Sequence, residues 1–311
     1  MKFTPLTLDH LTPWADLLAI AFARQPSQMR QLLHFLQPET NLLAWGAWDG
    51  ERLVAQYSCL LRQLTLPGHA PDLAVGLSVN MAVHPAYRGR GLVKQVAQPV
   101  YATLAQRQVA AGVGFSNAAG VQVDKRSSGY GYQVVGPLRP YLLWLRAQPG
   151  LADFALTADW PEQPFAALGE GTAVQFAWTP ATLQHRFASH PFRNYQFGVW
   201  RQNGVVVGVV VYRPIRLAGV PAVGLLGAYG RDQANLLRHW AGAVQKAGYR
   251  LAHLVCPANS APLALLSGTA VCLPQPISRN PYYLTLKPLC STLPETVFHL
   301  ENWVCWGGDI L

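Results

Sequence analysis

The run Leu73–Val96, LAVGLSVNMAVHPAYRGRGLVKQV, constrains the fold more than any other stretch of this chain. It predicts a half-buried strand, then a tight turn rich in arginine and glycine, and then the first turns of a helix. The first N–H groups of a helix have no partner within the helix, and glycines let a ligand approach them closely. The run therefore predicts a phosphate-binding site at the helix N-terminus.

The spacing within the turn separates the known phosphate-binding motifs. A dinucleotide motif needs a third glycine, but Lys94 occupies that position after Gly89 and Gly91. A Walker A loop needs a longer gap between its glycines. The pattern V-x-P-x-x-R-G-x-G, with Arg88 and Gly91 at two defining positions, instead resembles the acyl-CoA-binding motif of the GNAT acetyltransferase superfamily.

This resemblance implies acetyl-CoA (coenzyme A) as the cofactor, held by the backbone of the strand and the turn. A backbone N–H of the strand would polarise the thioester carbonyl. Val93 stands where the family has Gly or Ala, and Asn117, at the end of the next predicted strand, would contact the pantetheine or the pyrophosphate. The residues that the resemblance implies for cofactor binding are Met81, Ala82, Val83, Arg88, Gly89, Arg90, Gly91, Leu92, Val93 and Asn117.

The flanking segments follow the same family order. Residues 42–64 predict a hairpin, with Asp49-Gly50 supplying its two-residue turn. After the next helix, Gly131, Tyr132 and Gly136 stand in register with the family's closing motif. The predicted fold class is α/β (α+β), with a mixed, mostly antiparallel sheet flanked by helices.

Acyl transfer to an amine needs a base for the amine and an acid for the leaving thiolate. No carboxylate lies between Leu73 and Val83, so a water chain relayed by Ser78 or Asn80 is one candidate base. By analogy with related multidomain enzymes, the Leu311 carboxylate and Asp309 are others. Either Tyr130 or Tyr132 would serve as the acid.

The second half of the sequence repeats this layout without the motif. It predicts a hairpin turning at Asn203-Gly204, then a strand, a helix over 231–250 and a strand ending at Asn259. The turn GAYGRD lacks the R-x-x-G-x-G spacing. The chain thus resembles a bacterial tandem GNAT protein, with a catalytic domain at 1–145 that binds acyl-CoA. Residues 146–311 are expected to form a degenerate GNAT-like domain with a C-terminal tail.

One competing motif overlaps the predicted site. Gly114, Ser116 and Ala118 give G-x-S-x-A, close to the nucleophile elbow of hydrolases, for which Asp232 and His253 are the available partners. That fold needs many alternating strands and helices, which this sequence does not predict. The motif is therefore interpreted as coincidental.

Composition excludes several classes of protein. The 311 residues are 50% hydrophobic, yet no apolar run approaches the ~18 residues of a membrane span. The net charge of +9 is scattered rather than gathered in a nucleic-acid-binding block, although Lys125 and Arg126 add to the charge near the motif. Five scattered cysteines without a C-x-x-C pair indicate a reduced cytoplasm and no metal site.

The predicted function is N-acetyl transfer from acetyl-CoA to the amine of a small metabolite or amino sugar, by direct attack on the thioester. Two alternatives stay open: another acyl donor or a carrier-protein acceptor, and a non-catalytic acyl-CoA-binding protein. The expected partner is a small-molecule amine, with neither nucleic acid nor membrane. A homodimer is left open.

Overall fold

In the computed structural model the chain divides into two compact units. The structure describes the chain apart from residues 37–40, 125–130, 147–152, 163–164, 167–172, 259–262, 264–269, 274–281 and 311. The first unit comprises residues 1–64, 71–135 and 283–298. The second comprises residues 65–70, 136–282 and 299–311.

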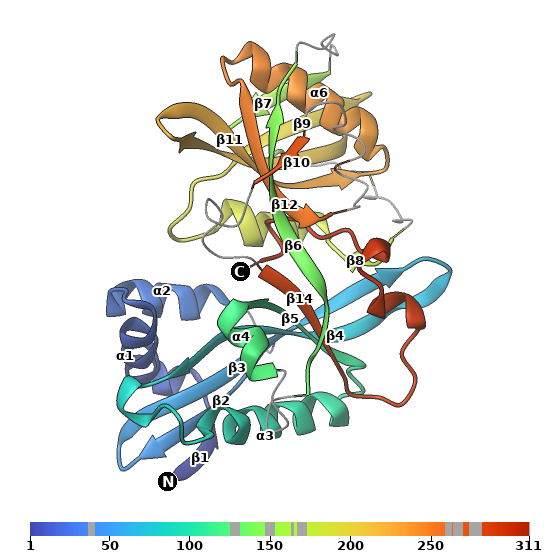
Figure 1. Ribbon diagram of the computed structural model, residues 1–311. Helices are drawn as coiled ribbons and strands as arrows, with labels where there is room; N and C mark the ends of the chain where they lie inside the picture. The colour runs from blue at the N-terminus through green and yellow to red at the C-terminus, as the bar shows by residue number, and fades with distance from the viewer. Residues whose placement is uncertain are drawn as a thin grey trace. The chain divides into compact units, whose positions relative to one another are not determined.

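The first unit is a mixed sheet with helices on both faces (Figure 1). Its strands follow the order β1-β2-β3-β4-β5-β14, with β1, β2 and β3 antiparallel and β4 parallel to β5. Helices α1 and α2 cover one face, and α3 lies along the other. The elements are β1 (Lys2–Pro5), α1 (Leu11–Phe22), α2 (Pro26–Leu36), β2 (Leu42–Asp49), β3 (Arg52–Leu66), β4 (His69–Val83), α3 (Leu92–Gln106), β5 (Ala111–Asn117), α4 (Ala118–Asp124) and β14 (Tyr282–Pro288).

Helix α3 is held by an apolar stripe at helical spacing. Leu92, Val96, Val100 and Leu104 are all buried against the sheet. An added Cβ at Gly76 of β4 would lie 2.7 Å from Leu104 Cδ1, so glycine at this position lets the helix approach the strand. This packing fixes the N-terminus of α3 at the end of β4.

The strands of the second unit follow the order β6-β12-β11-β10-β9-β7. Strands β11 and β12 are parallel, and the other neighbours in this order are antiparallel. Helix α6 packs on one face through Trp240 and its neighbours, while α5 and η3 pack on the other. The elements are β6 (Gln133–Trp144), β7 (Phe154–Thr157), α5 (Pro180–Leu183), η3 (Gln184–Ala188), β9 (Gln196–Gln202), β10 (Val205–Leu217), β11 (Val220–Gly230), α6 (Gln233–Lys246) and β12 (Leu251–Pro257).

The remaining described elements are short. Two of them are two-residue and three-residue strands, and the others are single turns of 3₁₀ helix. They are η1 (Leu8–His10), η2 (Pro85–Tyr87), β8 (Gln175–Phe176), β13 (Ala270–Cys272), η4 (Glu295–Phe298) and η5 (Leu300–Asn302). Among the described helices, none is long and apolar enough to cross a membrane.

Both predicted hairpins are present. The second turns at Asn203-Gly204 as predicted, with φ of 51° and 79° at these residues. The turn of the first is one residue later than predicted: Asp49 pairs with Arg52, so Gly50 and Glu51 form the turn. Gly50 supplies the positive φ, and Asp49 can therefore stay in the strand.

The units and the predicted domains have different boundaries. The main part of the first unit ends at Val135, and the unit also includes residues 283–298, which contain most of β14. The sequence analysis placed the boundary at 145, because a strand that returns from far along the chain carries no local signal. The assignment of separate roles to the two parts stays a prediction.

Candidate functional site

Strands β4 and β5 pair over a short stretch and then separate. Their parallel register runs from Val75 opposite Ala111 to Leu77 opposite Val113, and the amide of Ala110 donates to the carbonyl of Ala74 at 2.9 Å. Beyond Leu77 both strands continue without pairing to each other. The backbone groups on the inner edges are therefore available to a ligand that enters between the strands.

The N-terminus of α3 follows this opening directly. Its N-cap residue is Gly91, in the left-handed region at φ 69°, and no side chain caps the helix. Gly89 is also left-handed, at φ 79°. The positions where a Cβ would stand on these two glycines have no described atom within 4 Å. The first turn of α3 thus has N–H groups that no capping side chain satisfies, as phosphate binding requires.

Basic side chains surround this helix end. Arg88 and Lys94 are exposed, and Arg90 stacks on the Tyr87 ring at 4.8 Å while donating to the carbonyl of Ala86 at 3.3 Å. The pKa of nearby His84 is lowered by desolvation and by the charges of Arg52 and Arg88. A polyanionic ligand would offset this concentration of positive charge.

Strand β4 is irregular where it borders the opening. Asn80 adopts φ 49° within the strand and is half-buried, and Met81 beside it is 36% exposed. The amide of His84 donates to Val54 of β3 at 2.8 Å. Because successive residues of a strand direct their backbone groups to alternate sides, the N–H of Val83 points away from β3 and toward the opening.

Tyr132 lies among buried tyrosines rather than at the surface. Its hydroxyl is 3.2 Å from that of Tyr57, which accepts a hydrogen bond from Tyr101 at 2.9 Å. Burial raises the pKa of Tyr57 and of Tyr101, so both phenols stay protonated. Ser78 hydrogen-bonds to Tyr57 and so belongs to the same cluster. The sequence analysis missed Tyr57 and Tyr101, which carry only the signature of core residues.

Strand β14 contributes polar groups that the sequence analysis also missed. Thr285 donates to the carbonyl of Gly114 at 3.2 Å, and its hydroxyl is 3.4 Å from that of Ser116. Lys287 stacks over the ring of Tyr101 at 4.9 Å, and burial lowers the pKa of its ammonium group. Both residues had been assigned to the second domain, since nothing local reveals a strand pairing so distant in sequence.

Two predicted cofactor residues have structural contacts of their own. Asn117 accepts a hydrogen bond from the amide of Gly120 at 2.9 Å and so begins α4. Val93, at the position where the family has Gly or Ala, packs its half-buried side chain against the core under α3. Leu92 is buried in that core, and Ala82 is buried in β4. The side chain of Val93 is therefore directed into the core.

Several predicted residues lie outside the described residues. They are Lys125, Arg126, Tyr130, Asn259 and Leu311.

Asp309 is described and is fully engaged within the second unit. Its carboxylate accepts from the amide of Trp306 at 2.7 Å and from the indole of Trp178 at 3.1 Å. Burial raises its pKa to about 6. Both carboxylate oxygens accept bonds from the protein, which suits a structural role better than that of a base.

The second unit repeats the same layout with different ends. Strands β11 and β12 pair only as far as Gly224 opposite His253. Leu226 then bulges from β11, and its carbonyl accepts the amide of Gly308 at 2.8 Å. The carboxylate of Asp232 caps α6 by accepting from the amide of Asn235 at 3.1 Å. This engagement also argues against Asp232 as part of a hydrolase triad.

The comparisons with known proteins agree with this geometry. The family model described as an acetyltransferase (GNAT) domain matches residues 2–132. Over these residues, which make up less than half of the chain, the protein is similar to the GNAT acetyltransferases. A domain of this family indicates an acyltransferase that uses acetyl-CoA as its acyl donor. The open, glycine-capped N-terminus of α3 and its basic surroundings fit the phosphates of that donor.

Solved structures extend the GNAT-like fold over nearly the whole chain. A probable N-acyltransferase from Enterococcus faecalis, a conserved protein of unknown function, is 14% identical at a TM-score of 0.66, over 93% of this chain and 72% of that one. A GCN5-related N-acetyltransferase from Anabaena variabilis is 10% identical at 0.67, over 93% and 73%. Another from Kribbella flavida is 15% identical at 0.64, over 92% and 70%. No curated protein matches the chain. The predicted mixed, mostly antiparallel GNAT fold is confirmed.

Proposed function

We propose that this protein is an acetyl-CoA-dependent N-acetyltransferase that acts on the amine of a small metabolite or amino sugar. The observation that carries the proposal is the separation of β4 from β5 beyond Leu77, followed directly by the uncapped N-terminus of α3. The first feature suits the pantetheine arm and the second the pyrophosphate. Acetyl-CoA supplies an activated thioester carbonyl.

The phosphates of the donor would be bound by backbone and charge together. The N–H groups that follow Gly91 would donate to the pyrophosphate, and Arg88, Arg90 and Lys94 would balance its charge. Gly89 and Gly91 leave room for this close approach because they carry no Cβ. Asn117 would contact the arm near the end of β5.

The backbone of β4 would stabilise the charge that develops during transfer. The acceptor amine would attack the carbonyl carbon, so that a C–N bond would form as the C–S bond breaks. N–H groups among Met81, Ala82 and Val83 would donate to the carbonyl oxygen as negative charge builds on it. The N–H of Val83 is supported best, because its direction follows from the bond between His84 and Val54.

The reaction needs one group that protonates the leaving thiolate and another that takes a proton from the attacking amine. We assign the leaving thiolate's proton to Tyr132, whose neighbours Tyr57 and Tyr101 form a connected chain of protonated phenols. A water held by Ser78 or Asn80 would take the proton of the amine. Tyr130 and the Leu311 carboxylate remain candidates from the sequence alone.

Release of free thiol from acetyl-CoA, measured with a panel of small amines and amino sugars, tests the proposal. We expect thiol release that depends on one class of amine. Tyr132→Phe should lower kcat with little change in acetyl-CoA binding, and Tyr212→Phe in the second unit is the matched control. If the protein binds acetyl-CoA but no amine in the panel causes thiol release, the result would instead support the non-catalytic alternative. Release of coenzyme A only when a carrier protein is supplied as the acceptor would support the carrier alternative.

A further inference from the structure

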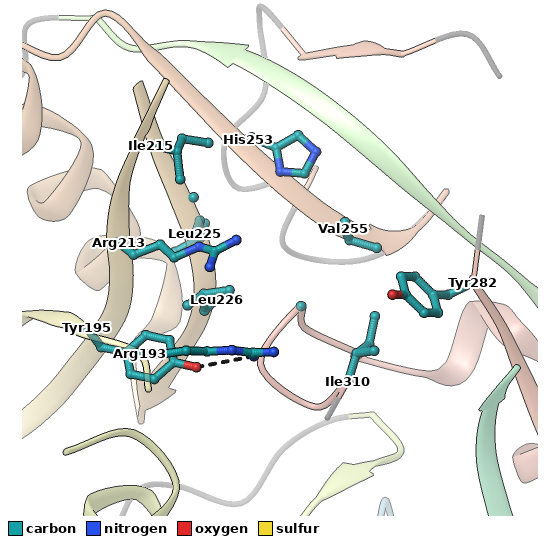
Figure 2. A pocket seen from close by; sticks show the side chains of 12 residues that line it. Arg193, Tyr195, Arg213, Ile215, Leu225, Leu226, His253, Val255, Tyr282 and Ile310 are labelled. Carbon is teal, nitrogen blue, oxygen red and sulfur yellow. Dashed lines mark hydrogen bonds between the residues drawn. The ribbon is translucent and has the colours of Figure 1, made fainter. Parts of the chain in front are cut away.

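The second unit contains a cavity of ≈ 230 Å³ at the place where β11 and β12 separate (Figure 2). Gly224, Leu225 and Leu226 of β11 form one wall, and His253 and Val255 of β12 form another. The cavity therefore occupies the position that corresponds, within this unit, to the opening between β4 and β5 in the first.

The cavity cannot take an acyl-CoA in the way the first unit does. The segment 306–310 crosses its floor, where the amide of Gly308 already bonds to the bulged carbonyl of Leu226. Arg186 holds this segment by donating to the carbonyls of Gly308 and Ile310 at 3.3 and 3.2 Å. The edge of β11 is thus occupied by the chain itself, and a smaller space remains above it.

Two arginines make the remaining space cationic. The side chains of Arg193, Arg213 and His253 converge on it from three different segments (Figure 2). The twelve lining residues include no Asp or Glu. Desolvation and the charge of Arg213 lower the pKa of His253. Desolvation and the charges of Arg186 and Arg193 lower the pKa of His190, which lies beside the cavity, to about 4. Positive charge here lacks a carboxylate partner among the lining residues.

The rest of the lining is apolar or phenolic. Ile215, Leu225, Leu226, Val255 and Ile310 supply aliphatic surface, and the hydroxyl of Tyr282 points toward the space. The volume is below the ~300–1,000 Å³ of pockets for drug-sized ligands. The matching ligand is small, with one anionic end and a short apolar body.

We propose that this cavity binds a small organic anion, whose carboxylate or phosphate group pairs with the guanidinium groups of Arg193 and Arg213. Guanidinium suits both oxyanions because its N–H donors form a planar fork. The apolar walls would enclose the body of the ligand. This site is separate from the proposed acyl-transfer chemistry, and its ligand has no thioester.

Calorimetric titration of the full chain with benzoate, phenyl phosphate and inorganic phosphate at constant ionic strength tests the proposal, with benzyl alcohol as the neutral probe. We expect binding of at least one organic anion and none of the alcohol. Preference between benzoate and phenyl phosphate separates the two head groups. Arg213→Gln and Arg193→Gln should each weaken binding at least tenfold, while Arg250→Gln, an exposed arginine of the same unit outside the lining, should not change it.

Acetyl-CoA titrations of the same variants separate this proposal from the proposed function. Arg213→Gln should bind acetyl-CoA as the unmodified protein does, and Gly91→Trp should bind the organic anion normally. The proposal is overturned if no organic anion binds or if the Arg213 and Arg193 variants bind it unchanged. It is also overturned if Gly91→Trp abolishes the anion signal, because the anion would then occupy the phosphate site at α3.

Discussion

The N-termini of α3 and α6 follow the same strand, turn and helix layout but present opposite chemistry. Helix α3 begins at Gly91, without a side-chain cap and beside Arg88 and Arg90. Helix α6 begins at Asp232, whose carboxylate accepts the amide of Asn235. An N-terminal carboxylate satisfies the helix dipole and repels a phosphate, whereas glycine leaves the same donors for a ligand. The residue type at the cap therefore distinguishes a helix end without a side-chain cap from one with a cap.

The strand openings differ in the same sense. Within the first unit, β4 and β5 separate after Leu77 with their inner edges exposed to a ligand. Within the second, Gly308 takes the carbonyl of Leu226 after the strands separate. The layout that we propose to bind acyl-CoA in the first unit thus holds a segment of the same chain in the second.

The largest expected effect concerns the proposed phosphate site at the N-terminus of α3. Acetyl-CoA at ~100 times its Kd should stabilise the protein by ~2.7 kcal/mol, and Gly91→Trp should abolish this gain because the indole fills the space in front of the helix. Thermal unfolding with and without acetyl-CoA measures it. Gly50→Trp is the matched control, since Gly50 is also left-handed with open space around its Cβ position. An unchanged gain in Gly91→Trp would contradict the site.

The closure of the second opening is tested by two adjacent glycines. A Cβ on Gly308 would lie 2.6 Å from the carbonyl oxygen of Leu226 and 2.8 Å from Phe187, whereas one on Gly307 would lie 3.6 Å from its nearest described atom. Gly308→Ala should therefore lower the free energy of unfolding by ~1–3 kcal/mol. Gly307→Ala should change it much less. Chemical denaturation of both variants measures the difference, and equal stabilities would show that the contact at Leu226 is loose.

Two substitutions at the N-cap of α3 separate the effect of side-chain charge from the effect of side-chain size. Gly91→Asp and Gly91→Asn add side chains of nearly equal size, and both residue types tolerate the left-handed region better than most. We expect Asp to bind acetyl-CoA ~10-fold more weakly than Asn, or ~1.4 kcal/mol, because its charge faces the pyrophosphate. Titration at several salt concentrations measures the ratio, which should shrink as salt rises. Equal affinities would mean that the phosphates lie away from the helix end.

The smallest expected effect is at α6. Asp232→Ala removes the cap and should cost ~1 kcal/mol of stability, while Asp232→Asn should retain most of the cap. Neither variant should create a second acetyl-CoA site, because Gly308 still occupies the edge of β11. Denaturation and a count of bound acetyl-CoA test both statements. A second equivalent of acetyl-CoA in Asp232→Ala would show that the cap alone had excluded the ligand.

The sequence predicted local features well and distant pairings poorly. Turn chemistry and periodicity act over a few residues. They predict the two glycines before α3, the strands β4 and β5 that precede and follow this helix, and the hairpin at Asn203-Gly204. Thr285 and Lys287 were missed, because their contacts with Gly114 and Tyr101 join residues far apart in the chain. The role of Asn117 at the start of α4 was likewise invisible without the helix in place.

The sequence by itself determined the motif at Arg88, its place between a strand and a helix, and the absence of that motif from the turn before Asp232. Each is a property of neighbouring residues, whose backbone preferences do not depend on the rest of the fold. Only the tertiary structure decided that Gly308 closes the opening in β11, that Asp309 is buried and bonded, and that basic groups line the space left above. These outcomes depend on which distant segments meet when the apolar faces are buried, and local propensity does not determine which segments these are.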